Sequence, residues 1–535
     1  MGHEKFLEIA LSRIPAILSL QDRNQFSPSY GSFDREHWQY KKTDTPYASV
    51  QCASFSLTLL YKNKLPNNPY FQNKKILEWI TAGLRFLGKI QKSDGSFDEY
   101  YPNERSYIGT ALTLYPCAEA FALIKDEIDE KSKSEIAGVL MKSAEFLSRN
   151  SEPKVLNQET MAMLAVYVTG KSLDTKKFDA VVRKKRDFIL SAQSSEGWFP
   201  EYGGCDVGYL SYTIDFLSTY YKKSSDEKVL EAIDKAIEFI SYFVHPNGTA
   251  GGEYTARNTE YLVPHGFMVM SERNALANSI LHFIEESLTR KRDFTTIDRL
   301  DNRYLPLYTH QYIQTYLDFK YDYKKEELPF QRQNFTKHFR DAGIMVKKQG
   351  HYYIIIGIKK GGVIRIYDTK TEDIYFADCG YVAKSSSSVS ASSYLDEKGN
   401  GNTAVANDDE IVLERKFYEI AWLTPSVVKH IVLRIILFNS FISKIVREQI
   451  KKRLITRMKL NDIKTSRVIQ FKSDKVIISD EVMSNEEIEL YNVDKFSFRY
   501  IPSSAFFQEQ EIRMNGIKFK GKQKYFKLQT EIQLK

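Results

Sequence analysis

The sequence predicts an α+β multidomain protein, with an N-terminal (α/α) helical toroid over residues 1–335 and a C-terminal antiparallel β-sandwich over residues 336–535. Up to about residue 320, apolar residues recur at i, i+3, i+4 and i+7, which is typical of amphipathic helices. Glycine turns punctuate these segments at regular intervals. After about residue 340, runs of β-branched and aromatic residues replace the helical spacing.

The helical part is predicted to be an array of hairpins. Its clearest segments are ILEWITAGLRFLGKIQ, EIAGVLMKSAEFLSRN, VLEAIDKAIEFISYFV and ALANSILHFIEESL. From Gly95 to Gly197 is 102 residues and from Gly197 to Gly248 is 51, so the turns indicate a repeat near 50 residues. Each repeat holds one helical hairpin that a glycine turn ends. Such hairpins bury their apolar faces only against neighbours, and closing the array into a ring gives each hairpin two neighbours.

The β part begins beyond a charged linker. Strands are predicted in HYYIIIGIKKGGVIRIYD, EDIYFADCGYVAK and SRVIQFKSDKVIISDEV, which glycine turns and polar loops separate. The segment YKKEELPFQRQNF is charged, contains proline and follows neither period, so we place the domain boundary there.

Residues 429–459 break the β pattern. They include nine Lys and Arg residues and one acidic residue, Glu448. We expect a partly helical insertion that interrupts the sandwich, with a common apolar face formed by Leu433, Ile436, Phe441, Ile445 and Ile450. Two interpretations are open: the helix packs into the core with its basic face in water, or it lies on an anionic membrane or polymer.

The composition is that of a soluble globular protein, with 42% hydrophobic and 27% charged residues. The formal net charge of +8 is a mild excess that suits an anionic partner. No nucleic-acid-binding module accompanies the basic residues, so nucleic acid is not the expected partner. Aromatic residues make up 13% of the chain, and their rings serve for core packing and for stacking on sugars.

The cysteines and the apolar segments predict a cytoplasmic protein. Cys52, Cys117, Cys205 and Cys379 lie far apart and form no CxxC pair, which is typical of reduced thiols. The N-terminal segment FLEIALSRIPAILSL has no clean apolar signal core, and no run of 18 uncharged apolar residues occurs. The sequence contains neither HExxH nor a paired-cysteine motif, so no cofactor is expected, and a zinc ion held by scattered histidines is the alternative left open.

A predicted helical toroid followed by strands that carry VKKQGHYYIIIGIKKGGVIRIYD resembles the heparinase II/III-like and alginate-lyase-like group of polysaccharide lyases. The local resemblance lies around Asn157-Gln158, from Asp206 to Tyr212 and from Gly251 to His265. The turns that begin at Gln91 and Gln193 also look like the repeats of terpene-cyclase toroids. That second likeness implies a ring of hairpins only, since the acid clusters of terpene cyclases do not occur here.

The resemblance implies β-elimination from a uronate polymer. This reaction needs a group that stabilises charge on the carboxylate, a base for the neighbouring proton and an acid for the leaving oxygen. In such lyases an Asn binds the carboxylate and a Tyr about fifty residues later transfers the proton. The matching residues are Asn157 and Tyr209, with Tyr212 as second choice. The position after this Asn, where a histidine is often found, holds Gln158, which can hydrogen-bond to the substrate but cannot accept a proton at neutral pH. The base is therefore expected to be Tyr209, Tyr212 or His265, and histidine is the natural base near pH 7.

Further candidates for substrate binding lie in polar loops. Arg257 offers a fork for a carboxylate, and Glu253 and Asn258 lie in the same glycine-rich stretch. Alternatively, Arg257 pairs with Glu253 or Glu260 and joins the toroid to the sandwich. Loops after the glycine turns are expected to meet at one mouth of the ring and to bring sugar-binding candidates there: Trp38, Tyr101, Arg105 and Trp198. Each of these can equally be a turn or packing residue.

The leading hypothesis is therefore a polysaccharide-lyase-like enzyme that cleaves or modifies uronate-containing acidic polysaccharide or oligosaccharide. One alternative is a uronate carbon-5 epimerase, which abstracts the same proton and returns it on the other face. The other is a non-catalytic glycan-binding protein of cell-surface polysaccharide biosynthesis, which the replacement of the expected histidine by Gln158 favours.

Overall fold

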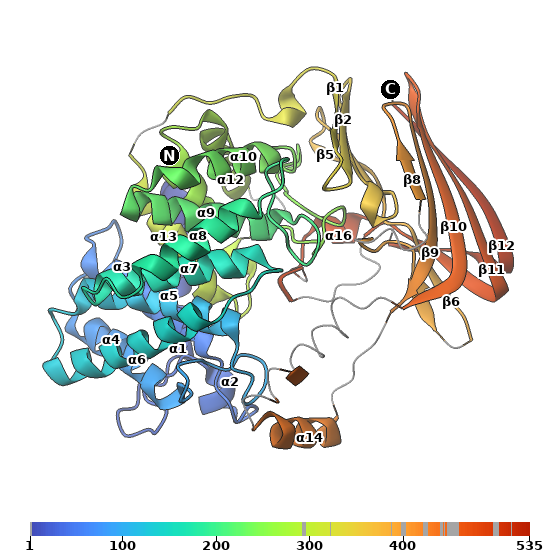
Figure 1. Cartoon of the computed structure of the whole chain (residues 1–535). Coiled ribbons are helices and arrows are strands. Elements are labelled where there is room, and N and C mark those ends of the chain that lie inside the picture. The colour runs from blue at the N-terminus through green and yellow to red at the C-terminus, as the bar shows by residue number, and fades with distance from the viewer. Residues whose placement is uncertain are drawn as a thin grey trace.

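The computed structural model describes residues 3–290, 296–320, 323–386, 388–396, 403–420, 426–438, 442, 445–446, 459–495, 502–504, 506–514 and 516–534. Helices occupy the N-terminal part and antiparallel sheets the C-terminal part (Figure 1). The helices are α1 (Glu4–Leu20), α2 (Arg35–Trp38), α3 (Ala53–Lys62), α4 (Lys74–Ile90), α5 (Tyr107–Ile124), α6 (Glu130–Arg149), α7 (Leu156–Ser172), α8 (Asp179–Ser191), α9 (Val207–Ser224), α10 (Leu230–Ser241), α11 (Pro264–Met270), α12 (Ala275–Thr289) and α13 (Leu305–Asp318).

Alternate helices form a closed inner ring. α3 packs on α5, α5 on α7, α7 on α9, α9 on α11, α11 on α13, and α13 returns to α3. The remaining helices lie outside them, with α4, α6, α8, α10, α12 and α1 each packed on an inner neighbour. The inner helices are apolar almost all round because both faces are buried. For example, α5 is apolar and long enough to span a membrane, yet 72% of it is buried between its neighbours.

The glycine turns recur at equivalent places in the ring. Gly95 and Gly197 have φ of +93° and +99°, and a Cβ on either would lie 2.1–2.2 Å from a carbonyl oxygen of the next outer helix. Gln91 and Gln193, four residues before these glycines, each donate a 2.8 Å side-chain hydrogen bond to a carbonyl of that same helix. The repeat seen in the sequence is thus a turn that locks each hairpin onto the next.

We expect Gly95→Ala to lower the free energy of unfolding by more than about 1 kcal/mol, since alanine strains this φ and its Cβ meets the Lys142 carbonyl. The matched control is Gly138→Ala on the exposed side of α6, where a Cβ meets nothing within 4 Å. That change should stabilise the helix by about 0.5–1 kcal/mol. Equal melting temperatures for the two variants would contradict this account of the turn.

The strands form two sheets. They are β1 (Phe335–Phe339), β2 (Ile344–Gln349), β3 (Tyr352–Gly357), β4 (Val363–Asp368), β5 (Asp373–Asp378), β6 (Tyr381–Lys384), β7 (Val389–Ala391), β8 (Thr403–Ala406), β9 (Glu410–Glu419), β10 (Leu460–Phe471), β11 (Lys475–Val493) and β12 (Ile517–Gln533). The first sheet has the order β1-β2-β3-β4-β5. The second has the order β10-β11-β6-β7-β9-β8, with β12 beside β11 and with β10 also paired to β9. Every pair is antiparallel.

The first sheet is a middle layer between the ring and the second sheet. On β3, Tyr353 and Ile355 join the hydrophobic core of the ring, whereas Ile354 and Ile356 share a core with β9, β10 and β11. A strand that is buried on both faces needs a continuous apolar run, which explains the unbroken sequence YYIII. The change from helix to strand falls between Asp318 and Phe335.

The basic segment is inserted between β9 and β10, which pair directly with each other. Its described part includes a helix, α14 (Val427–Leu437), in agreement with the prediction of a partly helical insertion. Ile436 and Ile445 are exposed, so the expected packing of this face into the core is not found there. The Leu433 side chain, Phe441 and Ile450 lie outside the described residues.

Candidate functional site at the mouth of the helical ring

The inner helices begin at the same end of the ring, which we call the mouth. Tyr107 at the start of α5 donates a 2.6 Å hydrogen bond to Glu159 in the first turn of α7. Long loops lead from the outer to the inner helices at this end: 91–106, 192–206 and 242–263. The polar residues that follow the glycine turns therefore lie in loops at one end of the ring.

Asp206 holds two of these loops together. Its side chain caps α9 by accepting from the Tyr209 amide, and it also accepts from the Arg257 amide at 3.0 Å. The hydroxyls of Thr255 and Thr259 donate to the same carboxylate. Asp206 is buried, and burial raises its pKa. The segments 206–212 and 251–265, which the sequence analysis singled out separately, thus meet at one carboxylate.

Glu201 and Asn157 are two buried polar residues of the mouth. Glu201 Oε1 accepts from the backbone N–H of Asn157 at 2.9 Å, and both residues are at least nine-tenths buried. Among the described residues, neither Glu201 Oε2 nor Asn157 Oδ1 has a hydrogen-bond partner. Burial, with Asp206 nearby, raises the pKa of Glu201 well above its usual range. The carboxyl therefore holds its proton at higher pH than an ordinary glutamate.

Arg257 is the cation beside this carboxyl. Its guanidinium lies 4.3 Å from the centre of the Tyr202 ring, and its Nη2 donates to the Tyr202 carbonyl at 3.3 Å. The charge of Arg257 acts on Glu201 and lowers its pKa against the effect of burial. Gln158, in the first turn of α7, is half-buried and hydrogen-bonds to the Tyr202 side chain. Arg257, Asn157 and Gln158 therefore share one neighbourhood.

The two candidate tyrosines differ in their surroundings. Tyr209 is half-buried, and its hydroxyl lies 2.8 Å from Ser503 Oγ, on the segment between β11 and β12. Burial raises its pKa well above 10, so the phenol stays protonated at neutral pH. Tyr212 faces inward, where its ring stacks on Phe216 at 5.4 Å and meets Tyr308 edge-on at 5.5 Å. Tyr209 is therefore the better placed of the two for proton transfer at the mouth.

His265 has a different role from the one expected. It is fully buried, with Nδ1 2.7 Å from Asp215 and Nε2 2.8 Å from Asp318. Asp318 ends α13 and also pairs with Lys222 in the last turn of α9, so the histidine lies toward the opposite end of α9 from Tyr209. Both ring nitrogens are occupied, and His265 has none left for a substrate proton. We therefore drop it as the base.

The buried histidine predicts a pH-dependent stability. Burial alone would lower the pKa of His265, but the carboxylates of Asp215 and Asp318 outweigh it and raise the pKa to about 9. A raised pKa in the folded state gives stability that is present below the usual value of 6.5 and is lost as the pH rises through about 9. We expect the melting temperature to fall across this interval, and to fall less in His265→Gln. An identical fall in both proteins would contradict the ion-pair assignment.

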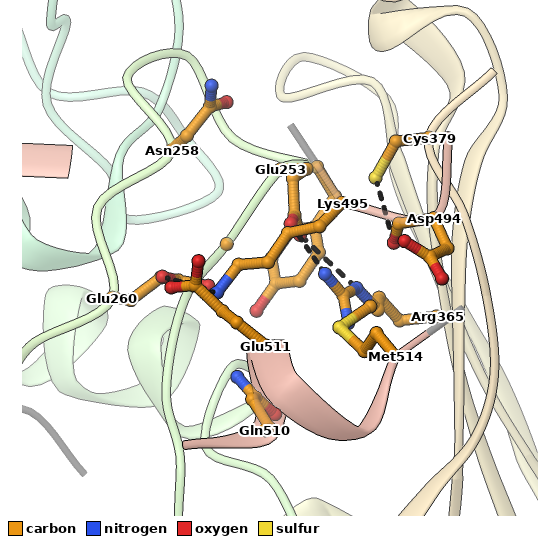
Figure 2. Close-up of polar contacts among 12 residues, drawn as sticks. Glu253, Asn258, Glu260, Arg365, Cys379, Asp494, Lys495, Gln510, Glu511 and Met514 are labelled. Atoms are coloured by element: carbon orange, nitrogen blue, oxygen red, sulfur yellow. Dashed lines mark hydrogen bonds and ion pairs between the residues drawn. The ribbon is translucent and has the colours of Figure 1, made fainter. Parts of the chain in front are cut away.

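Glu253 belongs to a buried network between the ring and the sheets (Figure 2), and Asn258 makes a separate contact across the same junction. Glu253 accepts from Arg365 of β4 at 2.5 and 3.2 Å, and Asn258 Oδ1 accepts from Lys360 at 2.9 Å. Arg365, rather than Arg257, is thus the partner of Glu253 that joins the two parts of the chain. Their contacts across this junction give Glu253 and Asn258 a structural role in place of the expected substrate binding.

The remaining candidates are mostly packing and turn residues. The Trp38 indole donates to the Leu20 carbonyl at 2.7 Å, and the Trp198 indole to Glu196 at 3.2 Å. Arg105 pairs with Asp94 at 2.8 Å within its own loop. Tyr101 is half-buried in that loop. The geometry gives Trp38, Trp198 and Arg105 structural partners and supports the packing interpretation for them.

An aromatic and cationic cluster at the mouth escaped the sequence analysis. Arg303, just before α13, lies 3.8 Å from the ring centre of Tyr47 and 4.5 Å from that of Tyr100. Tyr100 is 56% exposed, which leaves one ring open to solvent. Glu99 accepts from Ser106 beside them, and burial raises its pKa. Glu201 was missed as well, although it directly precedes the Tyr202-Gly203-Gly204 turn.

Two solved structures show the same fold at low sequence identity. No protein family and no curated protein matches this sequence. Chondroitin AC lyase of Streptomyces coelicolor A3, in complex with chondroitin sulphate, aligns over 92% of this chain and 68% of its own, with a TM-score of 0.56 and 9% identity. A Paenibacillus xanthan lyase aligns over 92% and 47%, with a TM-score of 0.55 and 10% identity. This chain therefore spans about half of the xanthan lyase.

The expected resemblance to polysaccharide lyases is confirmed for the fold. Heparinase III aligns over 100% of this chain and 90% of its own at 10% identity, with a TM-score of 0.44. Within the described residues, no group of three His, Cys, Asp or Glu side chains is placed to hold a metal ion. The described polar groups of the mouth include carboxyl, amide, phenol and guanidinium groups.

Proposed function

We propose that the protein is a polysaccharide-lyase-like enzyme that breaks uronate-containing acidic polysaccharide or oligosaccharide by proton abstraction and β-elimination. The main support is a pair of buried oxygens close to the charge of Arg257. These oxygens, Asn157 Oδ1 and Glu201 Oε2, have no hydrogen-bond partner among the described residues. Buried polar atoms without partners cost free energy, and the hydroxyls of a bound sugar would satisfy them. The ring and the two facing sheets would be the toroid and the sandwich of such an enzyme.

In this proposal Arg257 and Asn157 bind the uronate carboxylate. A guanidinium matches the two carboxylate oxygens, and the side-chain NH2 of Asn157 supplies a further donor. Negative charge grows on that carboxylate as the neighbouring carbon loses its proton. Fixed donors in a buried site stabilise this charge without having to reorganise.

Glu201 and Tyr209 would transfer the protons. A base works best when its pKa lies near the working pH, and burial moves the Glu201 pKa upward in that direction. The Tyr209 phenol keeps its proton at neutral pH and can donate it to the departing glycosidic oxygen. Glu201 thus takes the role that the sequence analysis gave to His265. The exposed Tyr100 ring offers a stacking surface for a neighbouring sugar.

The test is the formation of an unsaturated sugar. Elimination creates a carbon–carbon double bond conjugated with the carboxylate, which ultraviolet absorbance detects. We expect absorbance to rise with at least one polymer in a panel of uronate polysaccharides and to stay flat with a neutral glucan. Binding of a uronate polymer without the chromophore would favour a non-catalytic glycan-binding protein, and a panel that neither binds nor reacts would overturn the proposal.

The cytoplasmic location is also a proposal. All four cysteines are free and buried, which supports a reducing compartment. An enzyme there would act on imported oligosaccharides or within the biosynthesis of a cell-surface polysaccharide.

A further inference from the structure

The helix α14 presents a broad apolar face to solvent. Nine of the 22 large hydrophobic side chains that are exposed among the described residues lie between positions 427 and 445, so the concentration is local. On α14 and the residue that follows it, the exposed fractions run from 38% to 80%, for Val427, Val428, Ile431, Val432, Ile435, Ile436 and Phe438. At about 100° per residue, these side chains cover one half of the helix.

The other half of α14 attaches to the protein. Leu437 is fully buried, and Arg434 donates to Asp44 of the ring at 2.9 Å. Both residues fall on the half of the helix that the exposed valines and isoleucines leave free. Figure 1 shows α14 below the ring near α2, apart from the two sheets. The helix is therefore attached to the protein near its C-terminal end, through Arg434 and Leu437, and its apolar side is exposed.

The charge of the chain is concentrated in the same segment. Residues 429–459 hold nine of the 76 Lys and Arg residues and one of the 68 Asp and Glu residues. The rest of the chain therefore holds 67 of each, and its formal net charge is zero. The whole net charge of +8 belongs to the segment that begins with α14. An exposed apolar face next to this charge matches a surface that is both apolar and anionic.

We propose that α14 holds the protein on an anionic membrane surface. An amphipathic helix binds such a surface by placing its apolar side among the acyl chains and its basic residues at the phosphate headgroups. A bilayer accepts an apolar face of any shape, so no matched groove is needed. This inference does not depend on the proposed enzymatic function, because none of the residues proposed to bind or react with the sugar belongs to α14.

Vesicle flotation tests the inference with the full chain. We expect the protein to float with vesicles of phosphatidylcholine and phosphatidylserine at low salt, and much less with phosphatidylcholine alone. Ile431→Asp/Ile435→Asp should lower the floating fraction about tenfold or more, because it places charge on the apolar face. Lys451→Glu/Lys452→Glu should weaken binding to the anionic vesicles in particular.

The matched control is Ile512→Asp/Ile517→Asp, which changes two isoleucines that are 76% and 72% exposed elsewhere on the chain. This control should float like the unchanged protein. Failure of the unchanged protein to float at low salt would overturn the inference, as would equal loss in both double variants. A dimer in sedimentation that only Ile431→Asp/Ile435→Asp disrupts, without vesicle binding, would assign the face to a second copy of the chain and also overturn it.

Discussion

Tyr209→Phe is expected to lower kcat/KM on a uronate polymer by about 10²–10⁴-fold, the range that one positioned proton-transfer group supplies. The substitution keeps the aromatic ring and its packing and removes only the hydroxyl, whose one described partner is Ser503. The melting temperature should therefore change little. Initial rates of unsaturated-product formation, measured beside thermal unfolding, separate loss of chemistry from loss of fold.

The matched control is Tyr212→Phe, in which the same atom is removed three residues away. The Tyr212 ring packs against Phe216 and Tyr308 inside the ring of helices, so turnover should stay within a few-fold of the unchanged protein. Glu201→Gln should match the loss seen in Tyr209→Phe, because an amide cannot accept the substrate proton at neutral pH. Full activity in Tyr209→Phe, or greater loss in Tyr212→Phe, would contradict the assignment.

Glu253→Ala is expected to lower the free energy of unfolding by about 3–5 kcal/mol, the cost of leaving one partner of a buried ion pair without the other. Arg365 is 2% exposed, and besides Glu253 its closest described polar contact is Met514 Sδ at 3.9 Å. Because the pair joins the loop 242–263 to β4, its loss weakens the junction of ring and sheet. Chemical denaturation followed by far-ultraviolet circular dichroism measures the change.

Glu531→Ala is the control for this pair. Glu531 accepts from Lys475 at 3.1 Å between β12 and β11, where both side chains are at least 30% exposed, so the loss should be below about 1 kcal/mol. The double change Glu253→Met/Arg365→Met should recover much of the stability, since neither charge is then left unpaired. Equal losses in Glu253→Ala and Glu531→Ala would show that the buried pair does not hold the junction.

The fold was predictable where a local structural requirement restricts the residue type, as at a glycine turn or in a buried strand. The turn at Gly95 needs a positive φ and a close backbone approach, so glycine recurs at the repeat spacing. The run YYIII predicts a strand, although only the structure shows that β3 is buried on both faces. The exposure of α14 was not predictable, since the same apolar spacing is typical of a helix packed in a core.

The candidate site was predictable in part. Asn157, Tyr209 and Arg257 lie at the mouth, where the resemblance to lyases and the polar turns pointed. His265 failed because its partner Asp318 lies 53 residues away in sequence, and no local pattern reveals such a pair. What distinguishes Glu201 from other glutamates is the pKa that burial raises. This burial depends on how the loops 192–206 and 242–263 fold together, so the sequence gives no local sign of it. Titration behaviour of this kind follows from tertiary structure.

The central claim is that the mouth removes the proton next to a uronate carboxylate and expels the neighbouring sugar. Mass spectrometry of a uronate oligosaccharide after incubation with the protein in heavy water tests it most directly. Elimination predicts two fragments, of which the one with the unsaturated sugar is lighter by one water than the hydrolysis product. Recovery of the intact oligosaccharide, whether unlabelled or with one deuterium gained by epimerisation, would contradict the claim. So would two fragments whose summed mass exceeds that of the intact oligosaccharide by one water, which is the result of hydrolysis.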